Sequence, residues 1–213
     1  GGGITGAWIA LDCALRGLSV ALIEKNDFGG ATSSRSSKLL HSGIRYLQQL
    51  ELTKVRESAL ERKFVTRAAP HLVNHVPFLI PTYRSLRKSR AFLYAGMLGY
   101  RLLSAGTSCG LEDPATHVPR DYSLNVTRLR NITRLSDEKI TGAWVLHECQ
   151  MESSERMTQA VIARARQAGA LLINYVALEQ YNLTNGQVIG AIARDSEDDS
   201  RIRIDANLTV NAA

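Results

Sequence analysis

Three glycines and an acid near the start of the chain have types and spacing that could do chemistry. Gly1, Gly3 and Gly6 follow the pattern G-x-G-x-x-G, and Glu24 comes eighteen residues after Gly6. In a nucleotide-binding turn the first glycine permits a tight bend, the second lets the backbone approach a diphosphate, and the third lets the next helix pack closely. A carboxylate at the position of Glu24 accepts hydrogen bonds from a ribose diol and disfavours the 2′-phosphate of NADP. The spacing therefore predicts a dinucleotide site.

These residues need a helix and a strand to hold them. Residues 7–17 have apolar side chains at spacings of three and four, which predicts a helix, and Gly17 supplies its C-terminal stop. Residues 19–25 read as an apolar strand that carries Glu24. The first strand of such a motif should precede Gly1, and an apolar strand stops at the other end of the chain. We therefore expect the chain to be a fragment, cut at both ends.

A second group of polar residues follows, in the stretch NDFGGATSSRSSKLLHSGIRYLQQ. Its glycine pair and its serine and threonine cluster are typical of turns and helix starts, where hydroxyls and free N–H groups suit phosphate oxygens. Four further polar side chains come soon after: Lys38, His41, Arg45 and Tyr46. On composition alone, a solvated helix start with scattered charges is the competing interpretation.

The segment TSSRSSKLLHSGIRYL, together with the glycine motif before it, resembles the FAD-dependent glycerol-3-phosphate dehydrogenases. These belong to a wider group of flavin oxidoreductases that includes D-amino-acid oxidase. The resemblance continues through LTKVRESALERKFVTRAAPHLV and PFLIP, and again from RMTQAVIARARQAGALLINYVALEQ to LTVNAA. It implies FAD as cofactor, oxidation of sn-glycerol 3-phosphate to dihydroxyacetone phosphate by hydride transfer to the flavin, and a quinone as electron acceptor.

The resemblance also implies roles for individual residues. Arg45 and Tyr46 match substrate-facing positions, and an arginine suits a phosphate because its planar fork offers two parallel charge-assisted bonds. His41 matches a catalytic-site position beside the isoalloxazine ring, and Ala177 matches a backbone contact to the adenine. The remaining cofactor positions are Gly1, Gly3, Thr5 and Gly6 on the pyrophosphate, Glu24 on the adenosine ribose, and Thr32, Ser33, Ser36, Ser37 and Lys38 along the phosphates and sugar chain.

Three departures from the family pattern bear on these roles. Trp8 stands where a small glycine is usual, so helix packing should differ there. Ser42 replaces the second glycine of the usual His-Gly-Gly, which adds either local strain or a new hydrogen bond. Glu152 and two serines stand where the family tends to have an Asp-Asp pair. Ser42 and the change around Glu152 motivate an alternative, a related FAD-dependent oxidoreductase acting on an amine or a hydroxy acid. A non-catalytic nucleotide-binding module is the alternative from another class.

The middle of the chain is predicted to form a helix over residues 51–69 and a strand over 75–81 bounded by prolines. Residues 83–106 combine an apolar second half with five basic residues and no acid, which makes them the best candidate for a membrane surface. A helix packed on a neighbouring domain is the competing interpretation. The five basic residues are Arg84, Arg87, Lys88, Arg90 and Arg101.

The remainder predicts a loop over residues 107–130, a strand over 141–150, a helix over 153–170 and a strand over 171–176. His147 and Glu148 are adjacent on a strand and so face opposite ways, which argues against a catalytic pair. Strands over 187–195 and 201–210 flank a turn. We predict an α/β fold: a Rossmann-like FAD-binding domain (1–70, with a return and β-meander at 151–213) and an inserted antiparallel-sheet substrate domain (71–150).

Composition limits the other possibilities. The 213 residues are 45% apolar with a net charge of +6, and no repeat or zinc spacing points to nucleic acid. His71 and His75 are flanked by prolines and do not share a helix, so no metal site is predicted. Three widely spaced cysteines suggest reduced thiols. We expect a cytoplasmic protein, peripheral on the inner membrane if residues 83–106 bind lipid; the oligomeric state is left open.

Overall fold

The computed structural model describes residues 1–86, 88–107, 109–135 and 137–213. The chain forms two compact units, one of residues Gly1–Ser37 and Ser153–Ala213, the other of Lys38–Glu152. The second boundary lies within two residues of the expected one. The first lies near residue 37 rather than 70, because the helix over residues 52–68 buries its apolar face within the second unit.

The first unit is built on two helix-strand pairs. α1 (Ile4–Leu15) leads into β1 (Ala21–Ile23), and α6 (Ser154–Gln167) leads into β6 (Leu171–Ile173). β1 and β6 pair in parallel, and the two helices pack together over a core of small and branched residues. The helix over 153–170 is confirmed, and the Ser153 hydroxyl caps it by accepting from the Arg156 N–H at 3.1 Å.

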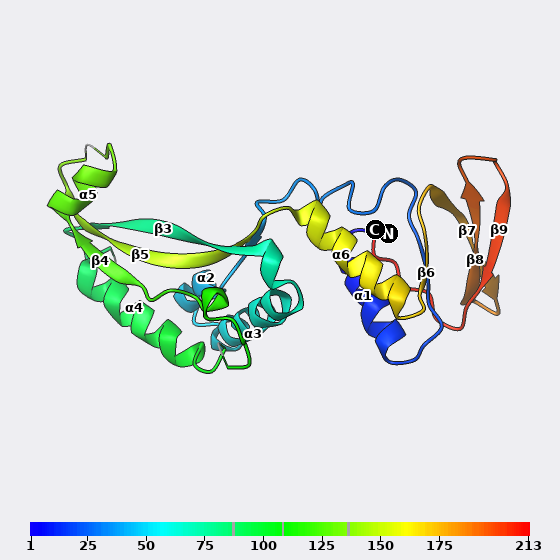
Figure 1. Cartoon of the computed structure of the whole chain (residues 1–213), viewed down its shortest axis with the longest axis horizontal. Coiled ribbons are helices and arrows are strands. Elements are labelled where there is room, and N and C mark those ends of the chain that lie inside the picture. The colour runs from blue at the N-terminus through cyan, green and yellow to red at the C-terminus, as the bar shows by residue number, and fades with distance from the viewer. Residues whose placement is uncertain (87, 108, 136) are drawn as a thin grey trace. The chain divides into compact units, whose positions relative to one another are not determined.

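An antiparallel meander completes this unit. It consists of β7 (Val176–Thr184), β8 (Gln187–Asp195) and β9 (Arg201–Asp205) in that spatial order. The strand expected over 201–210 ends at Asp205, and residues 206–213 form no strand. Figure 1 shows the meander as a separate sheet from the β1–β6 pair. The arrangement is the predicted α/β fold with an antiparallel meander.

A four-stranded antiparallel sheet forms the base of the second unit. Its central strand, β5 (Ile140–Met151), pairs with β2 (Leu39–Leu40), β3 (Val73–Tyr83) and β4 (Tyr122–Asn125). The prediction that prolines bound the strand over 75–81 is wrong, because Pro77 and Pro81 lie inside β3. They are tolerated since β3 is an edge strand and a proline there need not donate to a neighbour.

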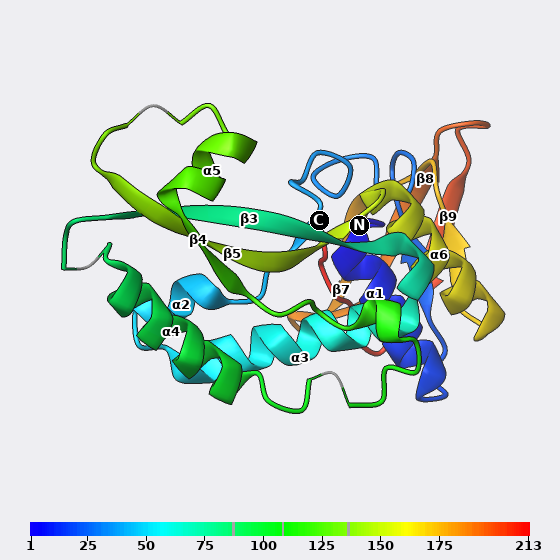
Figure 2. The same ribbon diagram turned by 60° about the vertical axis from the view of Figure 1, so that its left-hand side comes forward.

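Three helices cover one side of this sheet: α2 (Ile44–Gln48), α3 (Leu52–Ala68) and α4 (Arg90–Leu103) (Figures 1 and 2). α4 starts at Arg90, because the Ser89 hydroxyl accepts from the Phe92 N–H and caps the helix. The loop predicted over 107–130 instead holds the short 3-10 helix η2 (Pro114–Thr116), β4 and part of α5 (Val126–Ile132). A second short 3-10 helix, η1 (Pro70–Leu72), connects α3 to β3. Arg87 lies outside the described residues.

The described residues include neither a membrane-spanning helix nor a cluster of metal ligands. No helix there has the length and apolarity to cross a membrane. No group of three histidine, cysteine or acidic side chains there could hold a metal ion. His71 lies in η1 and His75 in β3, so the two do not share a helix. Cys13, Cys109 and Cys149 are free thiols.

Candidate cofactor-binding site

The glycine-rich turn has the geometry that its spacing predicts. Gly3 is the N-cap of α1. A Cβ on Gly6 would lie 1.9 Å from the carbonyl oxygen of Gly1, so no other residue fits there without moving the backbone. In the described part of the chain, the N–H groups of Gly3 and Thr5 have no acceptor. A helix N-terminus with free N–H groups is suited to bind a diphosphate.

Glu24 lies at this turn. Its Oε2 accepts from the Gly2 N–H at 2.6 Å and its Oε1 from the Asn26 N–H at 2.9 Å. Each carboxylate oxygen has a second lone pair, so both can also accept from a ribose hydroxyl. The backbone carbonyl of Glu24 accepts from the Val176 N–H at 2.9 Å, which places Ala177, the predicted adenine contact, next to the end of β1.

The structure brings the two sequence motifs together. The Ser33 hydroxyl accepts from the Ile4 N–H at 2.9 Å, so the serine cluster lies over the start of α1, 29 residues away in sequence. One of the N–H groups expected to be free is thereby occupied by a side chain. A hydroxyl at this place is itself a donor to phosphate oxygens. Residues 26–36 form turns and bends, and the helix α2 starts later in the same segment, at Ile44.

The other predicted cofactor residues divide between the units. Thr32, Ser36 and Ser37 belong to the first unit, in the turn segment around Ser33. Lys38 belongs to the second, has a left-handed backbone with φ 60°, and accepts at its carbonyl from the Met151 N–H at 2.7 Å. Their contact with a cofactor stays a prediction.

The residues predicted to face flavin and substrate lie together on a turn of the second unit. His41, Arg45 and Tyr46 are all exposed, on or just before α2. The Lys54 ammonium lies 5.5 Å from the centre of the Tyr46 ring. Gly43 has φ 78°, and a Cβ there would lie 2.8 Å from the Cβ of Ser58. The left-handed glycine thus lets the turn pack closely on α3.

The sequence left open whether Ser42 adds strain or a hydrogen bond at this turn, and it did not identify the partner. The Ser42 N–H donates to Glu148 Oε2 at 2.9 Å, and the Ser42 hydroxyl donates to Oε1 at 2.5 Å. Both residues are buried. Ser42 is not among the non-glycine residues with positive φ, so its effect is a new hydrogen bond rather than strain. The signal in the sequence that could have pointed to this contact is Glu148, an acid within the largely apolar segment that forms β5.

Comparison with known proteins agrees with this geometry. A family model described as "FAD dependent oxidoreductase" matches residues 1–213. The chain belongs to this family. FAD, the predicted cofactor, is the one for which the family is named, and the predicted enzyme class is confirmed.

Within this family, the chain is similar to proteins named glycerol-3-phosphate dehydrogenase. The chain is 34% identical over its whole length to the mitochondrial glycerol-3-phosphate dehydrogenase of Saccharomyces cerevisiae, covering 32% of it. It is 36% identical over 90% of its length to the glycerol-3-phosphate dehydrogenase of Synechocystis, covering 33%. The chain therefore spans about a third of the length of these relatives.

Solved structures agree on the fold. The glycerol-3-phosphate dehydrogenase of Bacillus halodurans, solved with FAD, has a TM-score of 0.66 and 29% identity; 97% of this chain and 31% of that chain align. The L-proline dehydrogenase of P. horikoshii has a TM-score of 0.62 at 19% identity over 95% of this chain and 49% of that one, which shows a shared fold alone. The predicted α/β FAD-binding fold is confirmed.

The residues present fit FAD. The turn offers unoccupied N–H groups at Gly3 and Thr5, glycines where a Cβ would collide, and the Ser33 hydroxyl beside them. Glu24 presents its carboxylate at the same turn. These groups would hold the diphosphate and the adenosine ribose, and the helix N-terminus favours the negative charge of the phosphates.

Proposed function

We propose that the intact protein oxidises sn-glycerol 3-phosphate to dihydroxyacetone phosphate and passes the electrons to a quinone. The observation that carries this is 34–37% identity over the whole chain to relatives named glycerol-3-phosphate dehydrogenase. FAD, when bound, supplies the acceptor for the hydride that leaves carbon 2 of the substrate. The chain's own residues have to bind the phosphate and position that carbon.

Arg45 is the proposed phosphate ligand. Its side chain is exposed on α2, the described residues include no carboxylate paired with it, and its guanidinium can offer two parallel donors to a phosphate. Tyr46 is its neighbour, and the Lys54 ammonium over the Tyr46 ring is paired with the Glu51 carboxylate, so Arg45 is the cation left available for a phosphate. His41 lies just before the same turn and is the proposed residue beside the flavin.

Replacing Arg45 with methionine should raise the KM for glycerol 3-phosphate about tenfold to a hundredfold, because a charge-assisted contact of about 1.5–3 kcal/mol is lost. Steady-state kinetics of the intact protein with an artificial electron acceptor measures this. Arg56→Met is the matched control, since Arg56 is exposed on α3 and donates to the Leu103 carbonyl. Equal kinetics for Arg45→Met and the control would remove Arg45 from the site.

The electron acceptor has a second candidate. The chain is 37% identical over 99% of its length to the alpha-glycerophosphate oxidase of Streptococcus pyogenes, of which it covers 34%. An oxidase of this name favours molecular oxygen in place of a quinone. Turnover that produces hydrogen peroxide in air, and that a soluble quinone does not accelerate, would replace the quinone in the proposal.

A quinone is held in lipid, and α4 is the proposed contact with a membrane surface. α4 exposes Phe92, Tyr94 and Leu102, the last with 70% of its surface accessible. The basic residues Arg84 and Lys88 precede it, also exposed. An amphipathic helix with cations at one end suits an interface that contains anionic lipid. The protein would then be cytoplasmic and peripheral on the inner membrane.

Vesicle sedimentation tests this contact. The intact protein should bind vesicles of phosphatidylcholine with a third phosphatidylglycerol, and Leu102→Ser should bind several-fold less, because an exposed leucine can bury about 1.5–3 kcal/mol of apolar surface in lipid. Leu183→Ser is a matched control, since Leu183 is a similarly exposed leucine in the other unit. Equal loss of binding in both variants would contradict a site at α4.

The remaining alternatives predict other results. A family member acting on an amine or hydroxy acid would reduce its flavin with those substrates but not with glycerol 3-phosphate. A non-catalytic module would bind FAD tightly without any substrate bleaching its absorbance. Anaerobic mixing with a panel of the three substrate classes, followed by flavin absorbance, separates both alternatives from the proposed dehydrogenase.

A further inference from the structure

The second unit contains a cavity that the proposed function does not use. Its volume is about 400 Å³, within the range of small-molecule sites. Residues of α3, α4, β5 and the segment before β4 line it. Ser42 and Ile44 also border it, whereas His41, Arg45 and Tyr46 do not. The cavity thus adjoins the turn of the proposed substrate residues without including them.

All the buried side-chain atoms that lack a hydrogen-bond partner in the described structure belong to residues that line this one cavity. They are Arg62 Nη1, the Tyr100 hydroxyl, Asp121 Oδ2 and His147 Nδ1. The Tyr100 hydroxyl lies near Ser42 and Arg62 but has hydrogen-bond geometry to neither. Buried polar groups are nearly always paired, so four such atoms around one space indicate that a polar occupant belongs there.

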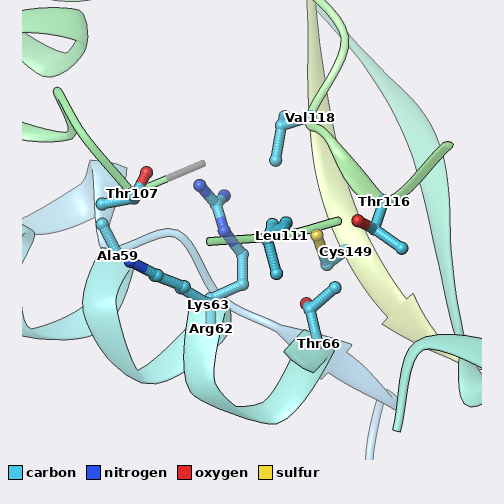
Figure 3. Close-up of a pocket in the computed structure, with 9 residues that line it drawn as sticks. All are labelled: Ala59, Arg62, Lys63, Thr66, Thr107, Leu111, Thr116, Val118 and Cys149. Carbon is cyan, nitrogen blue, oxygen red and sulfur yellow. The ribbon is translucent and has the colours of Figure 1, made fainter. Parts of the chain in front are cut away.

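Arg62 is the strongest indication among them. It lies in the middle of α3 and is only 6% exposed, and within the described residues its guanidinium makes no ion pair. The buried Glu148 carboxylate acts together with Arg62 on both Tyr100 and Cys149, but it accepts from Ser42 and makes no ion pair with Arg62. The guanidinium therefore has a counter-charge in its surroundings but no direct partner, and a buried charge without one is unfavourable. Figure 3 shows Arg62 extending from its helix toward Val118, beside Thr107 and Leu111. The residues in Figure 3 line a second, smaller pocket that shares Arg62 with the cavity. Its volume is only about 10 Å³, which holds at most one water, so the larger cavity is the one that can take a ligand.

The charge of the lining favours an anion. Arg62, Arg101 and Arg120 contribute three positive charges against the single carboxylate of Asp121. Asp121 is paired with Arg101 at 2.7 Å, and its other oxygen remains as an acceptor. Burial raises the pKa of Tyr100, which keeps its hydroxyl protonated and able to donate. Donors to an anion and an acceptor for a hydroxyl therefore face the same space.

We propose that this cavity binds a small oxyanion that also carries a hydroxyl group, a phosphorylated or carboxylated metabolite, with its charge on Arg62 and Tyr100 and its hydroxyl on Asp121. The Ser42–Glu148 contact lies at the cavity wall, so an occupant would contact the turn that carries Arg45. This second site goes beyond the proposed function and does not depend on it.

The test uses the intact holoprotein with FAD bound, so that free anions cannot report on an empty cofactor site. Thermal unfolding is followed with inorganic phosphate, with lactate, and with sodium chloride at equal ionic strength. Phosphate or lactate should raise the unfolding midpoint in a saturable way, and chloride should not. The anion that gives the larger rise in the unfolding midpoint shows whether the cavity prefers a phosphate or a carboxylate.

Three variants locate the effect. Arg62→Met should weaken the anion affinity at least tenfold, because the main cation of the lining is removed. Tyr100→Phe, which keeps the packing, should weaken it less. Arg45→Met should leave it unchanged, which separates this site from the proposed substrate site, and Arg56→Met is the control on α3.

Several outcomes would overturn the proposal. They are an absence of saturable stabilisation by either anion, an equal response in Arg62→Met and wild type, and loss of the response in Arg45→Met alone. A structure of the intact protein in which Arg62 pairs with a carboxylate of the protein itself, or in which the cavity holds water only at saturating phosphate and lactate, would do the same.

Discussion

Replacing Gly6 with alanine should leave the intact protein without bound FAD. The added Cβ would lie 1.9 Å from the Gly1 carbonyl oxygen, far inside contact distance, so the turn has to open. The free N–H groups of Gly3 and Thr5 can then no longer both donate to the same diphosphate. We expect at least a hundredfold weaker FAD binding, about 2.7 kcal/mol, measured as flavin absorbance per protein and by titration of the apoprotein with FAD.

Gly99→Ala is the matched control for this change. Gly99 lies inside α4, and nothing is within 4 Å of the position of its added Cβ. We expect normal FAD content and a gain of roughly 0.5–1 kcal/mol in the free energy of unfolding, because alanine is the better helix former. Circular dichroism shows whether Gly6→Ala keeps its helices. A folded Gly6→Ala protein that purifies with stoichiometric FAD would contradict the diphosphate role of the turn.

The local elements of the first unit could be predicted because their signals are contained in short segments. The helix beginning near Gly3, the strand that ends just before Glu24 and the helix over residues 154–167 each depend on signals between residues close together in the sequence. The prediction that the last strand continues beyond Asp205 was wrong because a strand depends on a distant pairing partner as well as on its own sequence. Its apolar pattern is that of a strand, but a strand needs a partner, and the described residues provide none there.

The second unit was harder because its order depends on contacts between distant residues. β4 and α5 lie in a polar segment that contains Pro119, and only pairing with β5 makes β4 a strand. The boundary near residue 37 depends on where α3 buries Val55 and Ala59. Neither is visible in local periodicity. The cavity around Arg62 is likewise formed by elements that are far apart in sequence.

The site shows the same division. The spacing of Gly1, Gly3 and Gly6 predicted the tight turn that precedes α1 in the structure, because this spacing reflects local backbone geometry. The contact from Ser33 to the start of α1 could be expected only through the family resemblance, since 29 residues separate the two. The resemblance indicated that Ser42, which stands in place of a family glycine, could add a hydrogen bond, but its partner Glu148 is 106 residues away and neither spacing nor resemblance identified it.

The contact between Ser42 and Glu148 is expected to contribute strongly to the stability of the fold. Replacing Glu148 with alanine should lower the free energy of unfolding by about 2–4 kcal/mol, because the N–H and the hydroxyl of Ser42 would both be left buried without an acceptor. Glu148→Gln should lose less, since its amide oxygen still satisfies one donor. Urea unfolding of the intact holoprotein, followed by fluorescence, measures both losses.

The same variants test whether this contact holds the turn in its working position. If it does, Glu148→Gln should raise the KM for glycerol 3-phosphate while leaving the flavin content unchanged, because Arg45 lies three residues after Ser42. Glu61→Ala is the control, an exposed acid on α3. A double change, Ser42→Gly with Glu148→Gln, should lose less stability than the sum of the single changes, since the two residues share one interaction. Additive losses, or a Glu148→Ala protein as stable as Glu61→Ala, would show that β5 does not anchor the turn.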